Sequence, residues 1–205
     1  MKRFVVKIVG IILFLTVSCS IHAQLGITGG INRSSLINGN TGIRWNNYYK
    51  TGFQIGAFYD IDLSDKFKFQ PGITLLNESS RRFVKGEPGD SNDHNEATTS
   101  YSCFIPLVFS YKIPAEINQD FLIDFGLYSS FGLWGVSDET IDFVREKTKL
   151  YPNVRDVLDL GLIAGIGYDT KRINYSLRLK YGMRSFNYHN DTPITFLLSL
   201  GYKLK

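Results

Sequence analysis

Apolar and polar residues alternate at every second position in eight segments of the 205-residue chain, and this period constrains the fold most. It is clearest in residues 172–184, where Leu177 and Leu179 fall on one face of an extended strand and Arg178 and Lys180 on the other. An ordinary half-buried strand turns its apolar face to a core and its charged face to water. The eight segments are residues 25–32, 52–61, 67–75, 101–112, 121–134, 157–169, 172–184 and 194–204.

The lengths of the connections between these segments alternate. Short polar turns are expected at 62–66, 114–120 and 169–172, whereas the last connection, 186–192, is intermediate. The alternation predicts that all turns lie at one end of the sheet and all loops at the other, as in outer-membrane barrels. We therefore expect an all-β fold, an eight-stranded antiparallel up-and-down transmembrane β-barrel. The long polar loops are expected at 34–50, 79–99 and 135–155.

Segment length and aromatic residues agree with a barrel. A tilted strand needs about 9 to 11 residues to cross a bilayer, whereas strands of soluble sheets usually have about 5 or 6. Tyrosine and tryptophan fall largely toward the segment ends, where an aromatic girdle would meet the lipid boundary. No stretch after the first two dozen residues holds the roughly 18 apolar residues of a spanning helix.

The lipid environment decides which face of each strand turns inward. An Arg or Lys near the bilayer midplane on the lipid side costs about 2 to 4 kcal/mol, so Arg178 and Lys180 are expected in the lumen. We predict that Asp124 and Asp159, on strands neighbouring residues 172–184, pair with these two cations as a polar lumen network. The same phase also places further acids and bases inside: Asp60, Glu78, Lys68, Lys112, Arg184 and Lys203.

The first residues have the layout of a secretory signal peptide. Lys2, Arg3 and Lys7 precede or interrupt a short apolar run that ends in "IHAQ", so residues 1–23 are expected to be cleaved and residues 24–205 to form the barrel domain. A retained short anchor and a lipoprotein signal at Cys19 are the alternatives.

Removing the signal leaves 23 − 3 = 20 Lys and Arg against 19 Asp and Glu, which argues against nucleic-acid binding. Cys103 would then have no partner for an intrachain disulfide.

Several motifs give the chain a family resemblance. They are "IHAQ", "GITGGIN", "FIPLVFSYKI", "DFGLYSSFGLWG", "DLGLIAGIGYD" and the terminal "SLGYKLK". Together they resemble the small outer-membrane β-barrel proteins of Gram-negative bacteria grouped with PorT, over the whole mature chain. The resemblance implies two partners, outer-membrane lipid and the barrel-assembly machinery. Leu204 and Lys205 stand where family members usually end in an aromatic residue.

Catalytic and metal-binding patterns are weak in this sequence. His94 and His189 are the two histidines after the signal, and both are expected in loops as solvated side chains rather than as bases of a lipid hydrolase at the rim. Residues 87–96 hold Glu87, Asp90, Asp93, His94 and Glu96 but lack calcium-loop spacing, so a polar loop is favoured over a cation site. We expect no cofactor, no metal and no enzymatic activity.

The expected function is therefore structural or interactive. An eight-stranded barrel is just wide enough inside for side chains, so a plugged lumen is expected rather than a diffusion pore. The long loops would carry the function, as an accessory to secretion or adhesion with an unknown extracellular or periplasmic protein partner. A soluble lipocalin-like binder of hydrophobic ligands, which would invert the strands, and the rim enzyme are the alternatives.

One helix is expected. Residues 136–155 begin with Ser137 and place Ile141, Val144 and Thr148 at helical spacing, which predicts a short helix inside the third loop.

Overall fold

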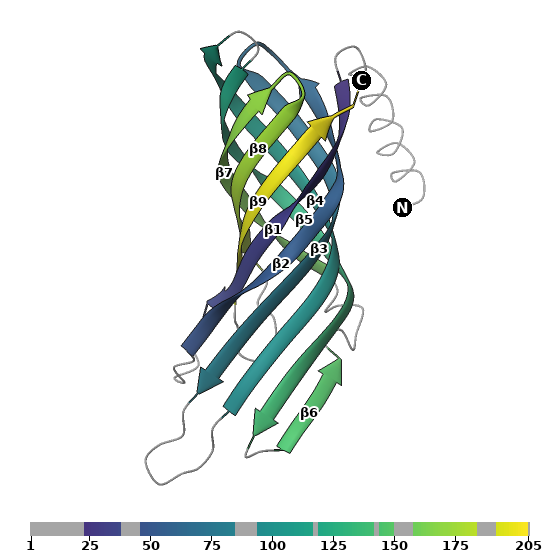
Figure 1. Ribbon diagram of the computed structural model, residues 1–205, viewed down its shortest axis with the longest axis vertical. Helices are drawn as coiled ribbons and strands as arrows, with labels where there is room; N and C mark the ends of the chain where they lie inside the picture. The colour runs from purple at the N-terminus through teal and green to yellow at the C-terminus, as the bar shows by residue number, and fades with distance from the viewer. Residues whose placement is uncertain are drawn as a thin grey trace, which may run out of the picture.

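Nine β-strands make up the described part of the chain, and eight of them close into a barrel (Figure 1). The computed structural model describes residues 23–37, 46–84, 94–116, 119–141, 144–149, 158–183 and 192–204. The strands are β1 (Ala23–Ile37), β2 (Asn46–Asp62), β3 (Phe67–Val84), β4 (His94–Glu116), β5 (Gln119–Ile141), β6 (Val144–Lys149), β7 (Leu158–Thr170), β8 (Ile173–Gly182) and β9 (Thr192–Lys203).

Hydrogen bonding closes the sheet into a ring. Each barrel strand pairs antiparallel with its neighbour, from β1–β2 through β4–β5, β5–β7 and β8–β9. The ring is completed where β1 also pairs with β9, from Gly26 opposite Lys203 to Ile37 opposite Thr192. The eight-stranded antiparallel up-and-down barrel predicted from the sequence is therefore confirmed.

The short connections gather at one end of the barrel, together with both ends of the described chain (Figure 1). Hydroxyl groups organise two of these turns: Ser64 Oγ accepts a hydrogen bond from the Phe67 amide at 3.1 Å, and Thr170 Oγ1 accepts one from the Ile173 amide at 2.9 Å. Such side-chain bonds to the backbone favour tight turns. The turns predicted at 62–66 and 169–172 are confirmed.

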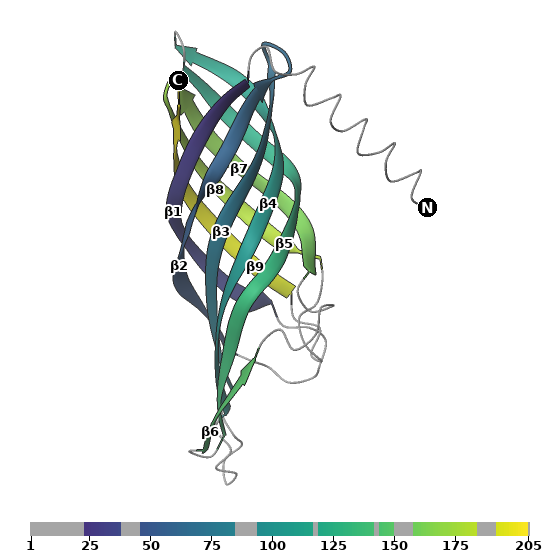
Figure 2. The same cartoon turned by 90° about the vertical axis from the view of Figure 1, so that its right-hand side faces the viewer.

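At the opposite end the sheet continues beyond the ring, which corrects the predicted loops (Figure 2). Residues 79–84 of β3 stay paired with residues 94–99 of β4, and β4 stays paired with β5 as far as Ile141. β6 then pairs with residues 136–141 of β5. We call this part, residues 46–49, 79–84, 94–100, 135–141 and 144–149, the overhanging sheet. Much of what was expected to be loop is therefore strand.

The helix predicted at 136–155 is wrong over residues 136–141 and 144–149, which are strands β5 and β6. The helical spacing there is a local pattern, and backbone pairing with β4 and between β5 and β6 overrides it. Residues 142–143 and 150–155 of that prediction lie outside the described residues.

The two faces of the barrel have opposite chemistry. Large apolar side chains stand on the outside, such as Ile55 at 61% and Ile166 at 61% exposure. The fully buried residues inside are mainly polar or charged, among them Asn32, Lys68, Ser110 and Asp124. This distribution is the reverse of a soluble lipocalin-like binder. Among the described residues, no helix is long and apolar enough to cross a membrane.

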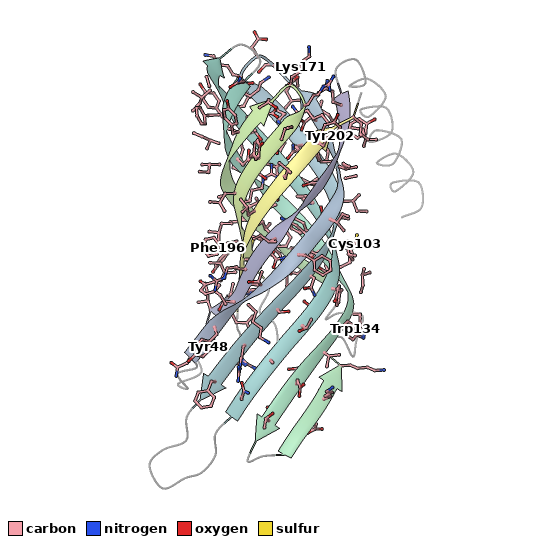
Figure 3. The ribbon with its side chains drawn as sticks, viewed as in Figure 1. Tyr48, Cys103, Trp134, Lys171, Phe196 and Tyr202 are labelled. Atoms are coloured by element: carbon pink, nitrogen blue, oxygen red, sulfur yellow. The ribbon has the colours of Figure 1, made fainter. Side chains whose placement is uncertain are left out.

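Aromatic pairs mark both limits of the apolar belt. Phe67 and Tyr111 lie with ring centroids 5.4 Å apart toward the turn end, and Tyr101 and Trp134 lie 5.5 Å apart toward the overhanging sheet. Figure 3 shows Trp134 on that side of the barrel. Tyr111 lies ten positions after Tyr101 along β4. At about 3.4 Å per residue and a tilt of about 40°, they span about 25 Å, the height of the apolar band in membrane barrels.

A polar network across the barrel lumen

Arg178 and Asp124 meet inside the barrel. Arg178 Nε donates a hydrogen bond to Asp124 Oδ2 at 2.7 Å, and Asp124 Oδ1 accepts a second one from Ser110 Oγ at 2.6 Å. Asp124 is 2% exposed, so its charge is held away from bulk water. A buried carboxylate needs such partners, because an unpaired charge in a poorly hydrated interior is costly.

The sequence analysis placed Asp124 on a strand next to β8, and this detail is wrong, because β7 lies between β5 and β8. Asp124 and Arg178 are both in register with Gly165 of β7. A Cβ at Gly165 would lie 2.8 Å from Arg178 Cγ and 2.5 Å from the Leu177 carbonyl oxygen. The glycine therefore leaves the space through which the arginine side chain crosses β7.

Lys180 lies among two acids and two rings. Its Nζ donates hydrogen bonds to Glu78 Oε1 at 3.0 Å and Oε2 at 2.8 Å, and it stands 3.7 Å from Asp159 Oδ2. Tyr128 donates a hydrogen bond from its hydroxyl to Asp159 Oδ2 at 2.7 Å, and its ring centroid is 5.1 Å from Lys180 Nζ. Thr195 Oγ1 also donates to Glu78. The structure thus adds Glu78 as the closest partner of Lys180.

A third cluster lies near the turn end. Lys68 Nζ is 3.3 Å from Asp60 Oδ2 and 2.8 Å from Asp169 Oδ2, and Lys203 Nζ reaches the same two carboxylates at 3.1 and 2.8 Å. The four residues come from β2, β3, β7 and β9, so their ion pairs join distant parts of the ring. Sequence analysis missed Asp169, because it falls at the last positions of a strand where a turn was expected.

Gln70 links the first and third clusters. Its Oε1 accepts a hydrogen bond from Arg178 Nη2 at 2.6 Å, and its Nε2 donates to Asp60 Oδ1 at 2.6 Å. One continuous chain of contacts therefore runs from Asp124 to Lys203. Apolar side chains fill space beside it: Leu76, Phe104, Val108, Tyr128, Ile163 and Leu197.

Two open spaces are bordered by described residues. An interior cavity of about 40 Å³ is bordered by Gln70, Phe104 and Arg178, and a vestibule of about 200 Å³ at the turn end is bordered by Asp60, Lys68 and other charged residues. Lys112, expected in the lumen, pairs with Asp62 at 2.9 Å beside this vestibule, where Asp62 is 56% exposed. Arg184 lies outside the described residues.

The suggested catalytic and cation-binding residues are mostly beyond the described structure. His189, Glu87, Asp90 and Asp93 lie outside it, as does the side chain of His94. Glu96 is described, and its Oε2 accepts a hydrogen bond from Arg82 Nε at 2.6 Å. Among the described residues, no three His, Cys, Asp or Glu side chains are grouped so that they could hold a metal ion.

A closed ring of antiparallel strands with an apolar exterior about 25 Å high and a polar, ion-paired interior is a transmembrane β-barrel. The family described as "Outer membrane protein beta-barrel domain" matches residues 18–188. The chain belongs to this family and is an outer-membrane β-barrel protein. No curated protein matches the chain.

Solved structures similar to this chain are also outer-membrane barrels. Ail, the attachment invasion locus protein of Yersinia pestis, is 13% identical, covers 90% of this chain and 100% of its own, and has a TM-score of 0.45. OprG of Pseudomonas aeruginosa is 14% identical, with 89% and 96% coverage and a TM-score of 0.43. Neisserial surface protein A is 12% identical, with 89% and 99% coverage and a TM-score of 0.42.

Proposed function

We propose that this outer-membrane barrel is a non-enzymatic interaction protein with a closed lumen, and that its outer end binds a protein partner. The observation that carries the proposal is the set of three ion-paired clusters across the lumen, in which five acids face four cations: Asp60, Glu78, Asp124, Asp159 and Asp169 with Lys68, Arg178, Lys180 and Lys203. Moving a solute through would require these buried pairs to separate, and breaking a buried pair costs about 3 to 5 kcal/mol.

Conductance tests the closed lumen. The purified full chain, inserted into planar lipid bilayers, is expected to give no sustained conductance steps. A diffusion porin at the same protein concentration is the positive control and should give such steps. Regular steps from the wild-type chain would contradict the closed lumen. The gel mobility of unheated samples serves as the control for folding, since an unfolded sample would also fail to conduct.

The overhanging sheet supports the outer end as the interaction surface. It extends past the aromatic pair Tyr101 and Trp134, so we place it outside the bilayer, with the short turns facing the periplasm. Glu96 is fixed there by Arg82 and by Ser137 Oγ, which donates a hydrogen bond at 2.7 Å. A sheet held by such hydrogen bonds keeps a fixed conformation, so it presents a binding surface to a partner more precisely than a free loop does.

Cross-linking in whole cells tests which end binds. A photoreactive residue at Lys147, an exposed position on β6, is expected to give adducts with a protein partner. The matched position is Lys171, an exposed lysine in the turn between β7 and β8 at the opposite end. Adducts from position 171 with none from position 147 would contradict the proposal and indicate a periplasmic partner.

We further propose that residues 1–23 are a signal peptide cleaved after Ala23, and that the barrel-assembly machinery inserts residues 24–205 into the outer membrane. Lys2, Arg3 and Lys7 near the apolar run and the small residue Ala23 support this assignment. Membership of the PorT group stays a prediction from the family resemblance, and a role as an accessory to secretion or adhesion stays a prediction from the long loops.

A further inference from the structure

Arg33 stands out on the lipid-facing surface of the barrel. Between the two aromatic limits, the outward-facing positions of the described barrel strands are apolar or uncharged, with Arg33 of β1 as the exception. It is exposed, two residues after the outward-facing Ile31, which is 54% exposed. Its alternation with buried Asn32 and Ser34 places it on the outer face. A cation on a lipid-facing surface is unfavourable, so its presence there indicates an interaction that stabilises it.

One aromatic ring lies close to the Arg33 side chain. Arg33 is in register with Phe196 of β9 and with Thr51 of β2. The Arg33 Cζ lies 5.9 Å from the centroid of the Tyr49 ring, and that ring lies 6.1 Å from the Phe196 ring. Tyr49 of β2, whose ring is next to that of Phe196 of β9, thus forms an outward-facing aromatic seat for the guanidinium group of Arg33. Cation–π contacts of this kind strengthen when water is excluded.

No carboxylate of the described residues pairs with Arg33: the ion pairs of the described structure involve other cations. This contrasts with the lumen, where every cation of the three clusters meets an acid. The five N–H groups of a guanidinium form a fork that fits the oxygens of a phosphate. Because no carboxylate in the described part of the chain neutralises Arg33, its guanidinium group fits an anionic phosphate that comes from outside the protein.

The position of Arg33 along β1 indicates which leaflet supplies that phosphate. β1 runs from the turn end at Ala23 to Ile37, so Arg33 lies in the part of the strand nearer the overhanging sheet. A long side chain there can extend along the apolar surface and place its charge at the headgroups. The cost of a cation on the lipid face falls to about 0 to 1 kcal/mol near the interface.

We propose that Arg33, seated on Tyr49, binds the phosphate of an anionic lipid headgroup in the outer leaflet of the membrane. The site fixes one lipid against β1, β2 and β9, next to the exposed side chain of Phe196 (Figure 3). It does not depend on a protein partner or on the closed lumen, but it does depend on the overhanging sheet facing outward.

Lipid binding to the full chain in detergent micelles tests the site, with native mass spectrometry to count bound lipids. The probes are diphosphorylated lipid A and the same lipid with its phosphates removed. Arg33→Gln is expected to weaken binding of the phosphorylated lipid by about tenfold, the loss of one charge-assisted hydrogen bond. Arg33→Lys keeps the charge and should retain much of the binding, whereas Tyr49→Leu should weaken it by a few-fold.

Lys171→Gln is the matched control, because it removes an exposed cation at the opposite end and should bind like the wild type. Unchanged binding by a folded Arg33→Gln variant would overturn the proposal, as would equal binding of the dephosphorylated lipid. Displacement of the lipid by millimolar inorganic phosphate would show a site for free phosphate and would also overturn it. Folding of each variant is checked by the mobility of unheated samples on a gel.

Discussion

Replacing Asp124 with alanine tests the lumen network at its most buried acid. The change removes the acceptor of two hydrogen bonds, from Ser110 Oγ at 2.6 Å and from Arg178 Nε at 2.7 Å. Arg178 keeps its contact with Gln70 but loses its countercharge. Leaving a buried charge without its partner costs about 3 to 5 kcal/mol. At about 2 to 4 °C per kcal/mol for a chain of this size, Asp124→Ala should lower Tm by about 10 °C.

The assay is thermal unfolding in detergent micelles, followed by the gel mobility of folded and unfolded chains. Asp62→Ala is the matched control, because Asp62 also pairs with a lysine but is 56% exposed, so its pair is worth less than about 1 kcal/mol. The double variant Asp124→Ala with Arg178→Met should recover part of the loss, because it removes the stranded charge as well. A Tm for Asp124→Ala equal to that of Asp62→Ala would refute the reasoning.

Three further predictions concern other parts of the barrel. Gly165→Ala should lower Tm by several degrees in the same assay, because its Cβ would lie 2.5 Å from a backbone oxygen of β8, whereas Gly29→Ala, whose nearest atom is 3.9 Å away, should be tolerated. Leu198→Arg, at 53% exposure in the apolar belt, should cost about 2 to 4 kcal/mol in urea unfolding from vesicles, against about 0 to 1 for Leu204→Arg near the strand end. Mass spectrometry of the protein from outer membranes should give Gln24 as its first residue, and a chain that retains residues 1–23 would contradict the cleavage.

The barrel was predictable because lipid outside and packed polar groups inside impose a strict period of two on every strand. The apolar phase of 172–184 and the short turns at 62–66 and 169–172 followed from that rule. The overhanging sheet was not predictable, because beyond the bilayer both faces of a strand can be polar and the alternation fades. Residues 79–84 and 94–99 therefore resemble loop in sequence, although they are paired strands.

The sequence predicted that cations and acids pair inside the lumen, but it did not predict which acid each cation meets. The period of two places Arg178, Lys180 and several acids inside, but the acid that each cation meets depends on strand tilt and on the room beside it. Arg178 reaches past β7 because Gly165 has no side chain, and Lys180 reaches across the lumen to Glu78 of β3. Neither distance can be derived from spacing along the chain.

The central claim is that lipid surrounds the apolar face of the strands and that the charged face is enclosed. Nitroxide labels placed one at a time along β8, in a chain with Cys103→Ser reconstituted in vesicles, test it most directly. Labels at Tyr175, Leu177 and Tyr181 should collide readily with oxygen dissolved in the bilayer, and labels at Asn174 and Ser176 should not. Accessibility in the opposite phase, or equal access of a water-soluble relaxation agent to all five positions, would contradict the account.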